Sequence, residues 1–209
     1  MLKIALPSGR MMKQVLAMLT AVGYKAPTVE DIGRKLFFDD PAHGIRYLVV
    51  KPSDLPVYVY RGAADLGVAG YDVLHEERPD VLELLDLGIG KCRMCVAAMK
   101  DYTPDTTRPI RVATKFVNTA KRHYRHHAGG VEIIKLNGAV ELAPVLAMSD
   151  VIVDIVETGT TLVENNLEIL ETIFPISSRL IANRAAYQFK RDEIVPLVEG
   201  LRGNLGDVM

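Results

Sequence analysis

Short apolar runs alternate with polar turns and with helical patterns along the chain. Runs bounded by Gly, Pro or Asp predict strands over residues 2–6, 45–50, 63–72, 82–87, 92–99, 110–113, 131–136, 151–156 and 167–183. Apolar positions three and four apart predict helices over residues 11–22, 115–128, 139–148 and 184–203, with shorter ones near Asp54, after Asp72 and from Leu162. Strands that alternate with helices predict an α/β fold with largely parallel sheets.

Two stretches depart from a simple parallel order. Residues 36–38 and 45–50, joined by a turn rich in Asp, Pro and Gly, predict an antiparallel hairpin. The extended segment 167–183, interrupted at Pro175, carries the chain back towards its first half. We therefore predict a bilobal fold of two mixed-sheet α/β lobes with a cleft between them. Lobe I comprises residues 1–90 plus 179–209, and lobe II comprises residues 91–178.

The strand predicted over residues 151–156 leads into a turn that suits a phosphate group. It is an apolar, β-branched run broken by Asp154, and Glu157-Thr158-Gly159-Thr160-Thr161 follows it before the next helix. Such a turn presents main-chain N–H groups and hydroxyls at a helix N-terminus, where an anion is stabilised. The same residues also cap helices that bind nothing. Asp154 favours the ligand interpretation, because a carboxylate in an apolar strand is costly to bury unless it meets a polar partner.

Further polar residues stand at strand ends in the first half of the chain. Gly9 and Arg10 follow the first strand, Lys51 and Asp54 follow the hairpin, and Asp72 follows the small-residue strand. Ligands of open α/β sheets gather at such positions. Arg10 is equally compatible with a salt bridge on the surface.

One pair of cysteines and one group of histidines are weaker candidates for a functional site, in this case a metal site. Cys92 and Cys95 form a lone Cys-x-x-Cys within a predicted strand, where residues three apart point to opposite faces, and no second Cys or His pair follows at zinc spacing. His123, His126 and His127 share one predicted helix with Lys121, Arg122 and Arg125. We interpret that helix as a solvated basic face with no carboxylate nearby.

Composition narrows the function classes. The 209 residues are 49% apolar, with a formal net charge of -1 and a pI near 6.5, which excludes a broad basic surface for nucleic acid or an anionic membrane. No stretch approaches the roughly 20 apolar residues of a membrane span, and the N-terminus lacks a secretion signal. We predict a cytoplasmic protein.

Long stretches of the chain resemble the ATP phosphoribosyltransferase family, whose members catalyse the first step of histidine biosynthesis. The signature-like stretches are ELAP at residues 141–144 and DVIVDIVETGTTL at 150–162. The resemblance extends to LPSGR (6–10), the block 51–72, GKCRMCVA (90–97), RVATKFVNT (111–119), VEIIKLNG (131–138) and SSRLIANRAAY (177–187). It implies a periplasmic-binding-protein-like (type II) fold.

The resemblance also implies a reaction and a set of site residues. Adenine N1 of ATP attacks C1 of phosphoribosyl pyrophosphate and releases pyrophosphate, with Mg²⁺ carried on the pyrophosphate and no metal ligand assigned to the protein. The phosphoribosyl pyrophosphate site would comprise Asp154, Glu141 and the loop Glu157, Thr158, Gly159, Thr160 and Thr161. The ATP site would comprise Gly9, Arg10, Lys51, Asp54 and Asp72, with Arg10 as the candidate for a catalytic role and no general base identified.

Partners and rival functions follow from the same resemblance. The length is similar to that of the short form of the family, which works in a hetero-oligomer with a regulatory subunit resembling histidyl-tRNA synthetase; a homodimer of this chain is also expected. Ser8, Lys51 and Ala147 stand where the family more often has Lys, Arg and Gly. They are the best support for one alternative, a decayed scaffold subunit of the same fold. A second alternative, a non-catalytic nucleotide sensor, is compatible with the fold, but the intact loop argues against it.

Overall fold

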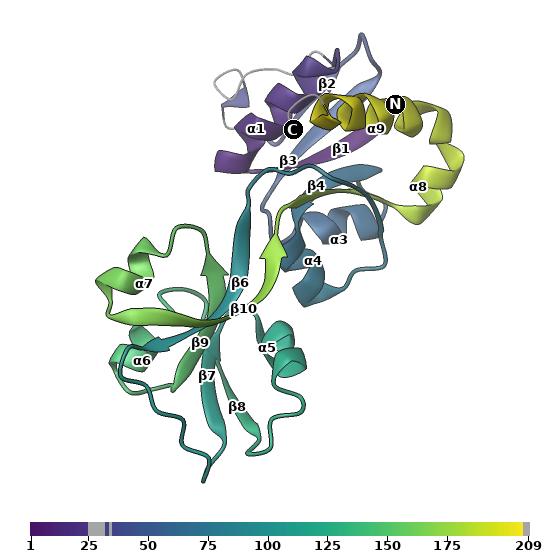
Figure 1. Ribbon diagram of the computed structural model, residues 1–209. Coiled ribbons are helices and arrows are strands. Elements are labelled where there is room, and N and C mark those ends of the chain that lie inside the picture. Colours follow the sequence, from purple (N-terminus) through teal and green to yellow (C-terminus); the bar gives the residue numbers. More distant parts are fainter. Residues whose placement is uncertain (25–31, 34, 207–209) are drawn as a thin grey trace. The chain divides into compact units, whose positions relative to one another are not determined.

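The computed structural model describes residues 1–24, 32–33 and 35–206, and the chain forms two compact units (Figure 1). Unit 1 comprises residues 1–74, 78–90 and 177–209, and unit 2 comprises residues 75–77 and 91–176. Each unit contains one mixed sheet with helices against it. Among the described helices, none is long and apolar enough to cross a membrane.

In unit 1 the described strands form a six-stranded sheet in the order β2-β3-β1-β4-β11-β5. Its three central parallel strands are β1, β3 and β4, and the antiparallel pairs β2/β3, β4/β11 and β11/β5 complete it. The predicted hairpin is confirmed as β2 and β3. The strands are β1 (Leu2–Pro7), β2 (Phe37–Asp40), β3 (Ile45–Val50), β4 (Leu66–Gly70), β5 (Leu82–Asp86) and β11 (Ser178–Ala182).

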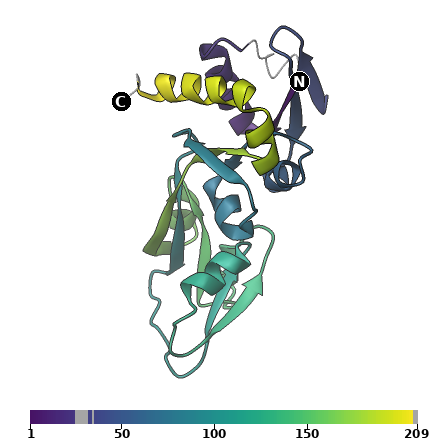
Figure 2. The ribbon, with the colours of Figure 1, turned by 90° about the vertical axis from the view of Figure 1, so that its right-hand side faces the viewer.

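Helices cover both faces of this sheet because its central strands are apolar on both sides. On β1, Ile4 and Leu6 face a core shared with α1 and α9, whereas Ala5 between them faces a core shared with α3 and α4. Figures 1 and 2 show α8 and α9 as consecutive helices at the end of the chain. The helices are α1 (Arg10–Ala21), α3 (Leu55–Tyr60), α4 (Tyr71–Glu77), α8 (Arg184–Phe189) and α9 (Arg191–Gly206).

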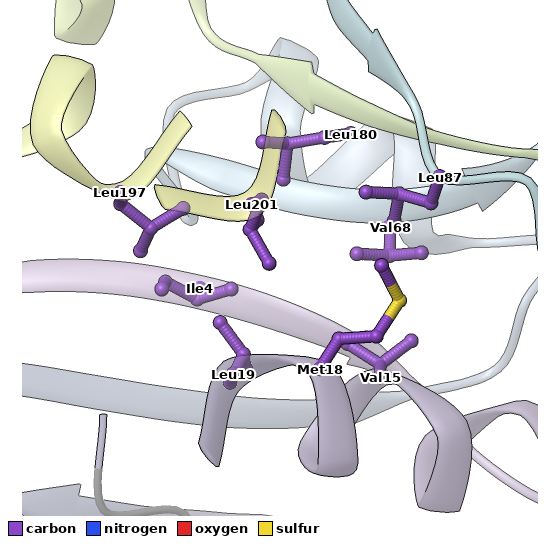
Figure 3. A pocket seen from close by; sticks show the side chains of 9 residues that line it. All are labelled: Ile4, Val15, Met18, Leu19, Val68, Leu87, Leu180, Leu197 and Leu201. Atoms are coloured by element: carbon purple, nitrogen blue, oxygen red, sulfur yellow. The ribbon is translucent and has the colours of Figure 1, made fainter. Parts of the chain in front are cut away.

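The core beneath α1 and α9 encloses a small apolar cavity of about 10 Å³ (Figure 3). Only aliphatic side chains and one methionine line it, among them Ile4, Val15, Met18 and Leu201. A space of that size without polar groups does not hold an ordered water. The cavity is therefore a packing defect rather than a ligand site.

In unit 2 the described strands form a five-stranded sheet in the order β10-β6-β9-β7-β8. The strand predicted over residues 151–156 is confirmed as β9, which lies at the centre of the sheet, parallel to β7 but antiparallel to β6. The elements are β6 (Cys92–Met99), β7 (Ile110–Thr114), α5 (Val117–His123), β8 (Val131–Lys135), α6 (Leu142–Val145), β9 (Val151–Val156), α7 (Thr160–Glu164) and β10 (Leu167–Ile176).

Three predictions about the elements of unit 2 are wrong: two helices are shorter than expected, and one strand is not interrupted where expected. The helix expected over residues 115–128 is only Val117–His123, because Phe116 has a non-helical ψ of 66°. The helix expected over 139–148 is only Leu142–Val145, because Ala139 and Ala147 have φ values of 48° and 55°. Pro175 does not interrupt β10, since β10 is an edge strand of this sheet and edge positions tolerate the missing N–H group.

Candidate functional site

The loop after β9 has the backbone shape of an anion-binding turn. Gly159 has a φ of 84° and precedes α7, which begins at Thr160. The hydroxyls of Thr158 and Thr160 lie 3.0 Å apart, and both side chains are exposed. Among the described residues, no hydrogen-bond acceptor meets the main-chain N–H groups of Thr161 and Leu162. This end of α7 therefore offers two amide donors and a pair of hydroxyls at one place.

Asp154 lies three residues before this loop, on the face of the sheet that α6 and α7 cover. Its neighbours at alternate positions, Ile152 and Val156, belong to the core that includes Ala143 of α6 and Leu162 of α7. The Asp154 side chain is half-buried, and its Oδ1 accepts the N–H of Ile155 at 2.8 Å. A half-buried carboxylate at the end of an apolar strand suits sugar hydroxyls, which donate hydrogen bonds to it.

Glu141 stands at the start of α6, a helix that covers the same face of the sheet. It is half-buried and precedes α6 as its N-cap, without a side-chain capping bond. The α6 residue Ala143 packs in the same core as Ile152, so α6 and the strand that carries Asp154 share one side of the sheet. The structure thus gathers Glu141, Asp154 and the loop 157–161 on one part of unit 2.

Two interactions fix β9 against β7. The buried hydroxyl of Thr114, at the end of β7, donates to the carbonyl oxygen of Val153 at 2.6 Å and accepts the Phe116 N–H at 2.8 Å. Thr114 is thus a strand-end residue whose hydroxyl joins β7 to β9. The second interaction lies at the opposite end of β9, where Asp150 precedes the strand.

The Asp150 carboxylate accepts hydrogen bonds from two arginines. Arg108 donates to both of its oxygens at 2.8 Å, and Arg111 donates through its main-chain N–H and its guanidinium, also at 2.8 Å. These bonds, from Arg108 above all, hold the pKa of Asp150 well below its usual range although partial burial opposes them. The start of β9 is therefore anchored by an ionised carboxylate.

In unit 1 the predicted nucleotide-site residues follow three parallel strands that lie side by side. Gly9 and Arg10 follow β1, Lys51 and Asp54 follow β3, and Asp72 follows β4. Because the carboxyl ends of parallel neighbours meet at the same edge, the structure places all five at one edge of this sheet. The helix α1 leaves that edge towards one face, and α3 and α4 leave towards the other.

The backbone explains the small residues at this edge. Gly9, the N-cap of α1, has a φ of 87°, and its Cβ position is open space. A Cβ on Gly70 would lie 2.2 Å from an Asp72 carboxylate oxygen, so a side chain at this position would force the Asp72 carboxylate to move. Asp54 is the N-cap of α3 but makes no capping bond, and its Oδ1 accepts the Ser53 hydroxyl instead. The Asp54 side chain therefore does not cap α3.

The surroundings of the histidines differ from what the sequence predicted. His126 and His127 lie beyond the end of α5, and His123 Nε2 is 3.3 Å from a carboxylate oxygen of Glu171, so the expectation of no nearby carboxylate is wrong. Glu171 comes from β10, far from His123 along the chain. Within the described residues, no three His, Cys, Asp or Glu side chains form a metal-binding group.

Arg122 also departs from the prediction. Its guanidinium contacts the main-chain carbonyl of His75 and the hydroxyl of Thr119 at 3.2 Å, so it does not belong to a solvated basic face. Beside it, the Glu76 carboxylate accepts the N–H groups of Asn118 and Thr119 at 2.8 Å each. The N-terminus of α5 is therefore capped by a side chain from the end of α4, which the sequence pattern did not indicate.

Comparison with solved structures defines the class. The chain is similar to ArgBP from Thermotoga maritima with a TM-score of 0.58 over 99% of this chain and 90% of that one, at 11% identity. That likeness shows the fold alone. Two mixed α/β sheets of this kind are typical of the periplasmic-binding-protein-like fold, here with a glycine turn between the central strand of unit 2 and α7.

Sequence comparison then identifies the family. The family model described as ATP phosphoribosyltransferase matches residues 51–203. The chain is 48% identical to the ATP phosphoribosyltransferase of Brachyspira hyodysenteriae over 96% of this chain and 98% of that protein, and 47% identical to that of Caldanaerobacter subterraneus. It is also similar to the structure "ATP phosphoribosyl transferase (HisG:HisZ) complex from Thermotoga maritima", with a TM-score of 0.84 and 36% identity over 97% of this chain and 98% of that one.

This chain belongs to the ATP phosphoribosyltransferase family. The predicted fold class and activity are confirmed, and the enzyme catalyses the first step of histidine biosynthesis. The two non-enzymatic alternatives, a sensor and a decayed scaffold, are not supported.

Proposed function

We propose that unit 2 binds phosphoribosyl pyrophosphate through the loop after β9. The 5-phosphate is bound by the loop Glu157 to Thr161, where the amides of Thr161 and Leu162 meet no acceptor among the described residues. That observation carries the proposal, because a dianionic phosphate is the ligand that unused amides at a helix N-terminus stabilise best. Gly159 allows the close approach, since its φ of 84° disfavours any side chain.

Asp154 and Glu141 orient the ribose in this proposal. Both carboxylates are half-buried and stand on the α6 and α7 side of unit 2, next to the loop. Carboxylates accept hydrogen bonds from two neighbouring sugar hydroxyls, which fixes the ring and therefore the direction of C1.

ATP is assigned to the sheet edge of unit 1. Arg10 and Lys51 are exposed cations at that edge, and the α1 N-terminus behind Gly9 adds a favourable dipole for phosphate oxygens. Asp54 and Asp72 are the carboxylates of the same edge and suit the ribose and adenine of ATP. In this proposal the predicted lobe I binds ATP and the predicted lobe II binds phosphoribosyl pyrophosphate.

The chemistry requires alignment more than proton transfer. The lone pair of adenine N1 forms a bond to C1 while the C1–O bond breaks and its electron pair leaves with pyrophosphate. Because N1 carries no proton, no general base is needed to activate it. The residues contribute by holding two polyanions in line and by neutralising the charge that accumulates on the leaving oxygen.

Magnesium enters as part of the substrate in this proposal. The ion is assigned to the pyrophosphate oxygens, because phosphate oxygens of the substrate are ligands that Mg²⁺ readily takes. When bound there, it neutralises part of the leaving-group charge.

A regulatory partner is proposed from the Thermotoga maritima structure, which is described as a HisG:HisZ complex and matches this chain along 97% of its length. We infer that this chain is the short form, that it assembles with a HisZ-like subunit resembling histidyl-tRNA synthetase, and that it also pairs with itself. Turnover of ATP and phosphoribosyl pyrophosphate, measured with and without that subunit, tests the requirement for a partner.

The site assignment is tested by Asp154→Asn, which removes a charge without changing the shape of the side chain. The KM for phosphoribosyl pyrophosphate should rise by roughly tenfold or more, as expected from loss of charged hydrogen bonds, whereas the KM for ATP stays unchanged. Glu168→Gln, at an exposed position of β10, is the matched control and should behave as the wild type. A folded Asp154→Asn enzyme with wild-type kinetics would show that the site lies elsewhere.

A further inference from the structure

Lys115 lies at the place in unit 2 where the helices that follow neighbouring strands switch from one face of the sheet to the other. It is the first residue after β7, and β7 runs parallel to β9 with Ala113 opposite Ile152. The helix after β7, α5, and the helix after β9, α7, lie on opposite sides of the sheet (Figure 1). Ligands of open α/β sheets bind beyond the carboxyl ends of the strands at such a switch point.

Continuing the register of β7 and β9 by two residues brings Lys115 beside Asp154. Each is two residues beyond the pair Ala113 and Ile152, and the bond from the Thr114 hydroxyl to the Val153 carbonyl, at 2.6 Å, locks the two strand ends together between them. The main chain at Lys115 is therefore fixed relative to the carboxylate that we assign to the ribose.

The ammonium group of Lys115 is available to an anion. Its side chain is exposed, and its Nζ lies 4.7 Å from the centre of the buried Phe116 ring. Within the described part of the chain, no carboxylate lies within ion-pair distance of it. A cation that rests on an aromatic face and has no acidic partner keeps its charge and its three N–H donors for a ligand.

We propose that Lys115 contacts the pyrophosphate group of phosphoribosyl pyrophosphate. The proposal rests on the function assigned above to Asp154 and the loop 157–161. The 5-phosphate is bound beyond the end of β9, whereas Lys115 stands level with the ribose, whose C1 carries the pyrophosphate. Lysine acts there as a mobile point charge that follows the departing group.

The experiment compares Lys115→Met and Lys115→Arg with Lys135→Met in the complete enzyme, with the regulatory subunit present. Lys135 ends β8 at the same sheet edge, one strand further from β9, and its exposed side chain supplies a charge-matched control. The measurements are kcat, the KM for each substrate, inhibition by pyrophosphate, and the melting temperature.

For Lys115→Met, the KM for phosphoribosyl pyrophosphate and the inhibition constant of pyrophosphate should both rise about tenfold, equivalent to about 1.4 kcal/mol. Lys115→Arg should recover most of this loss, Lys135→Met should match the wild type, and no variant should change the KM for ATP or the melting temperature. An unchanged pyrophosphate inhibition constant in Lys115→Met would overturn the proposal. Equal losses in Lys115→Met and Lys135→Met would also overturn it, because they would indicate only the general field of the edge.

Asp154→Asn, measured in parallel, separates the two hypotheses. If Asp154→Asn weakens phosphoribosyl pyrophosphate and Lys115→Met does not, only the role of Lys115 is wrong. If neither variant affects that substrate, the whole site is misplaced.

Discussion

Replacing Ala147 by glycine should stabilise the enzyme, even though it removes a side chain. Ala147 has a φ of 55°, in the left-handed region that costs a non-glycine residue about 1–2 kcal/mol. Its backbone is held there on both sides, because its N–H donates to the Pro144 carbonyl at 3.0 Å and its own carbonyl accepts from Arg111 at 3.0 Å. The turn cannot relax, so the strain persists in the folded state.

The expected gain is smaller than that strain. Glycine gives the unfolded chain more freedom, which offsets about 0.4–1 kcal/mol, and the exposed Ala147 methyl contributes little burial. The free energy of unfolding should therefore increase by about 0.5–1 kcal/mol. Equilibrium unfolding in urea, followed by circular dichroism, should show a higher midpoint with an unchanged slope.

Ala143→Gly supplies the opposite control. Ala143 is buried within α6, and glycine there should lower the midpoint by removing both a helix former and a packed methyl group. If Ala147→Gly lowered the midpoint as well, the left-handed strain would not be real. Catalysis should be unchanged in Ala147→Gly, because Ala147 is exposed and is not one of the residues assigned to either substrate.

Two further predictions concern the framework of unit 2. Asp150→Asn should lower the free energy of unfolding by about 2 kcal/mol at neutral pH. Because the folded-state pKa of Asp150 is depressed, this loss of stability relative to the wild type should be full above about pH 4 and should shrink at more acidic pH. A loss of stability that does not depend on pH would contradict this explanation. Exposed Asp101→Asn is the control. Glu76→Ala should remove the cap of α5 and lower the free energy of unfolding by about 1 kcal/mol. Hydrogen exchange should become faster at the main-chain amides of Asn118 and Thr119. Glu77→Ala, at the exposed neighbouring position, is the control and should leave the exchange rates unchanged.

Much of the fold could be predicted because its strands are apolar on both faces. The run at residues 151–156 needs cover on both sides, so a central position in a sheet followed, and β9 is central. Gly159 within a run of hydroxyl residues likewise indicated a turn with positive φ, which the structure shows. Both features depend on neighbours in the sequence.

Features that depend on distant partners could not be predicted. The α5 N-terminus is capped by Glu76, and His123 meets Glu171, although nothing near either residue in the sequence signals the contact. The strained φ of Ala147 is also invisible in the composition of a stretch that reads as helix. Lys115 was missed for a related reason, because its place beside Asp154 exists only once β7 pairs with β9.

The way unit 2 interrupts unit 1 sets the order in which the nascent chain can fold. In unit 1 the strand β5 pairs only with β11 among the described strands, and β11 emerges from the ribosome after all of residues 91–176. The core of unit 1 also waits for Ile194, Leu197 and Leu201 of α9. Unit 2 has all of its strands by Ile176, so it is complete first although the chain begins in unit 1. During synthesis, the species most exposed to aggregation is therefore the unfinished N-terminal sheet.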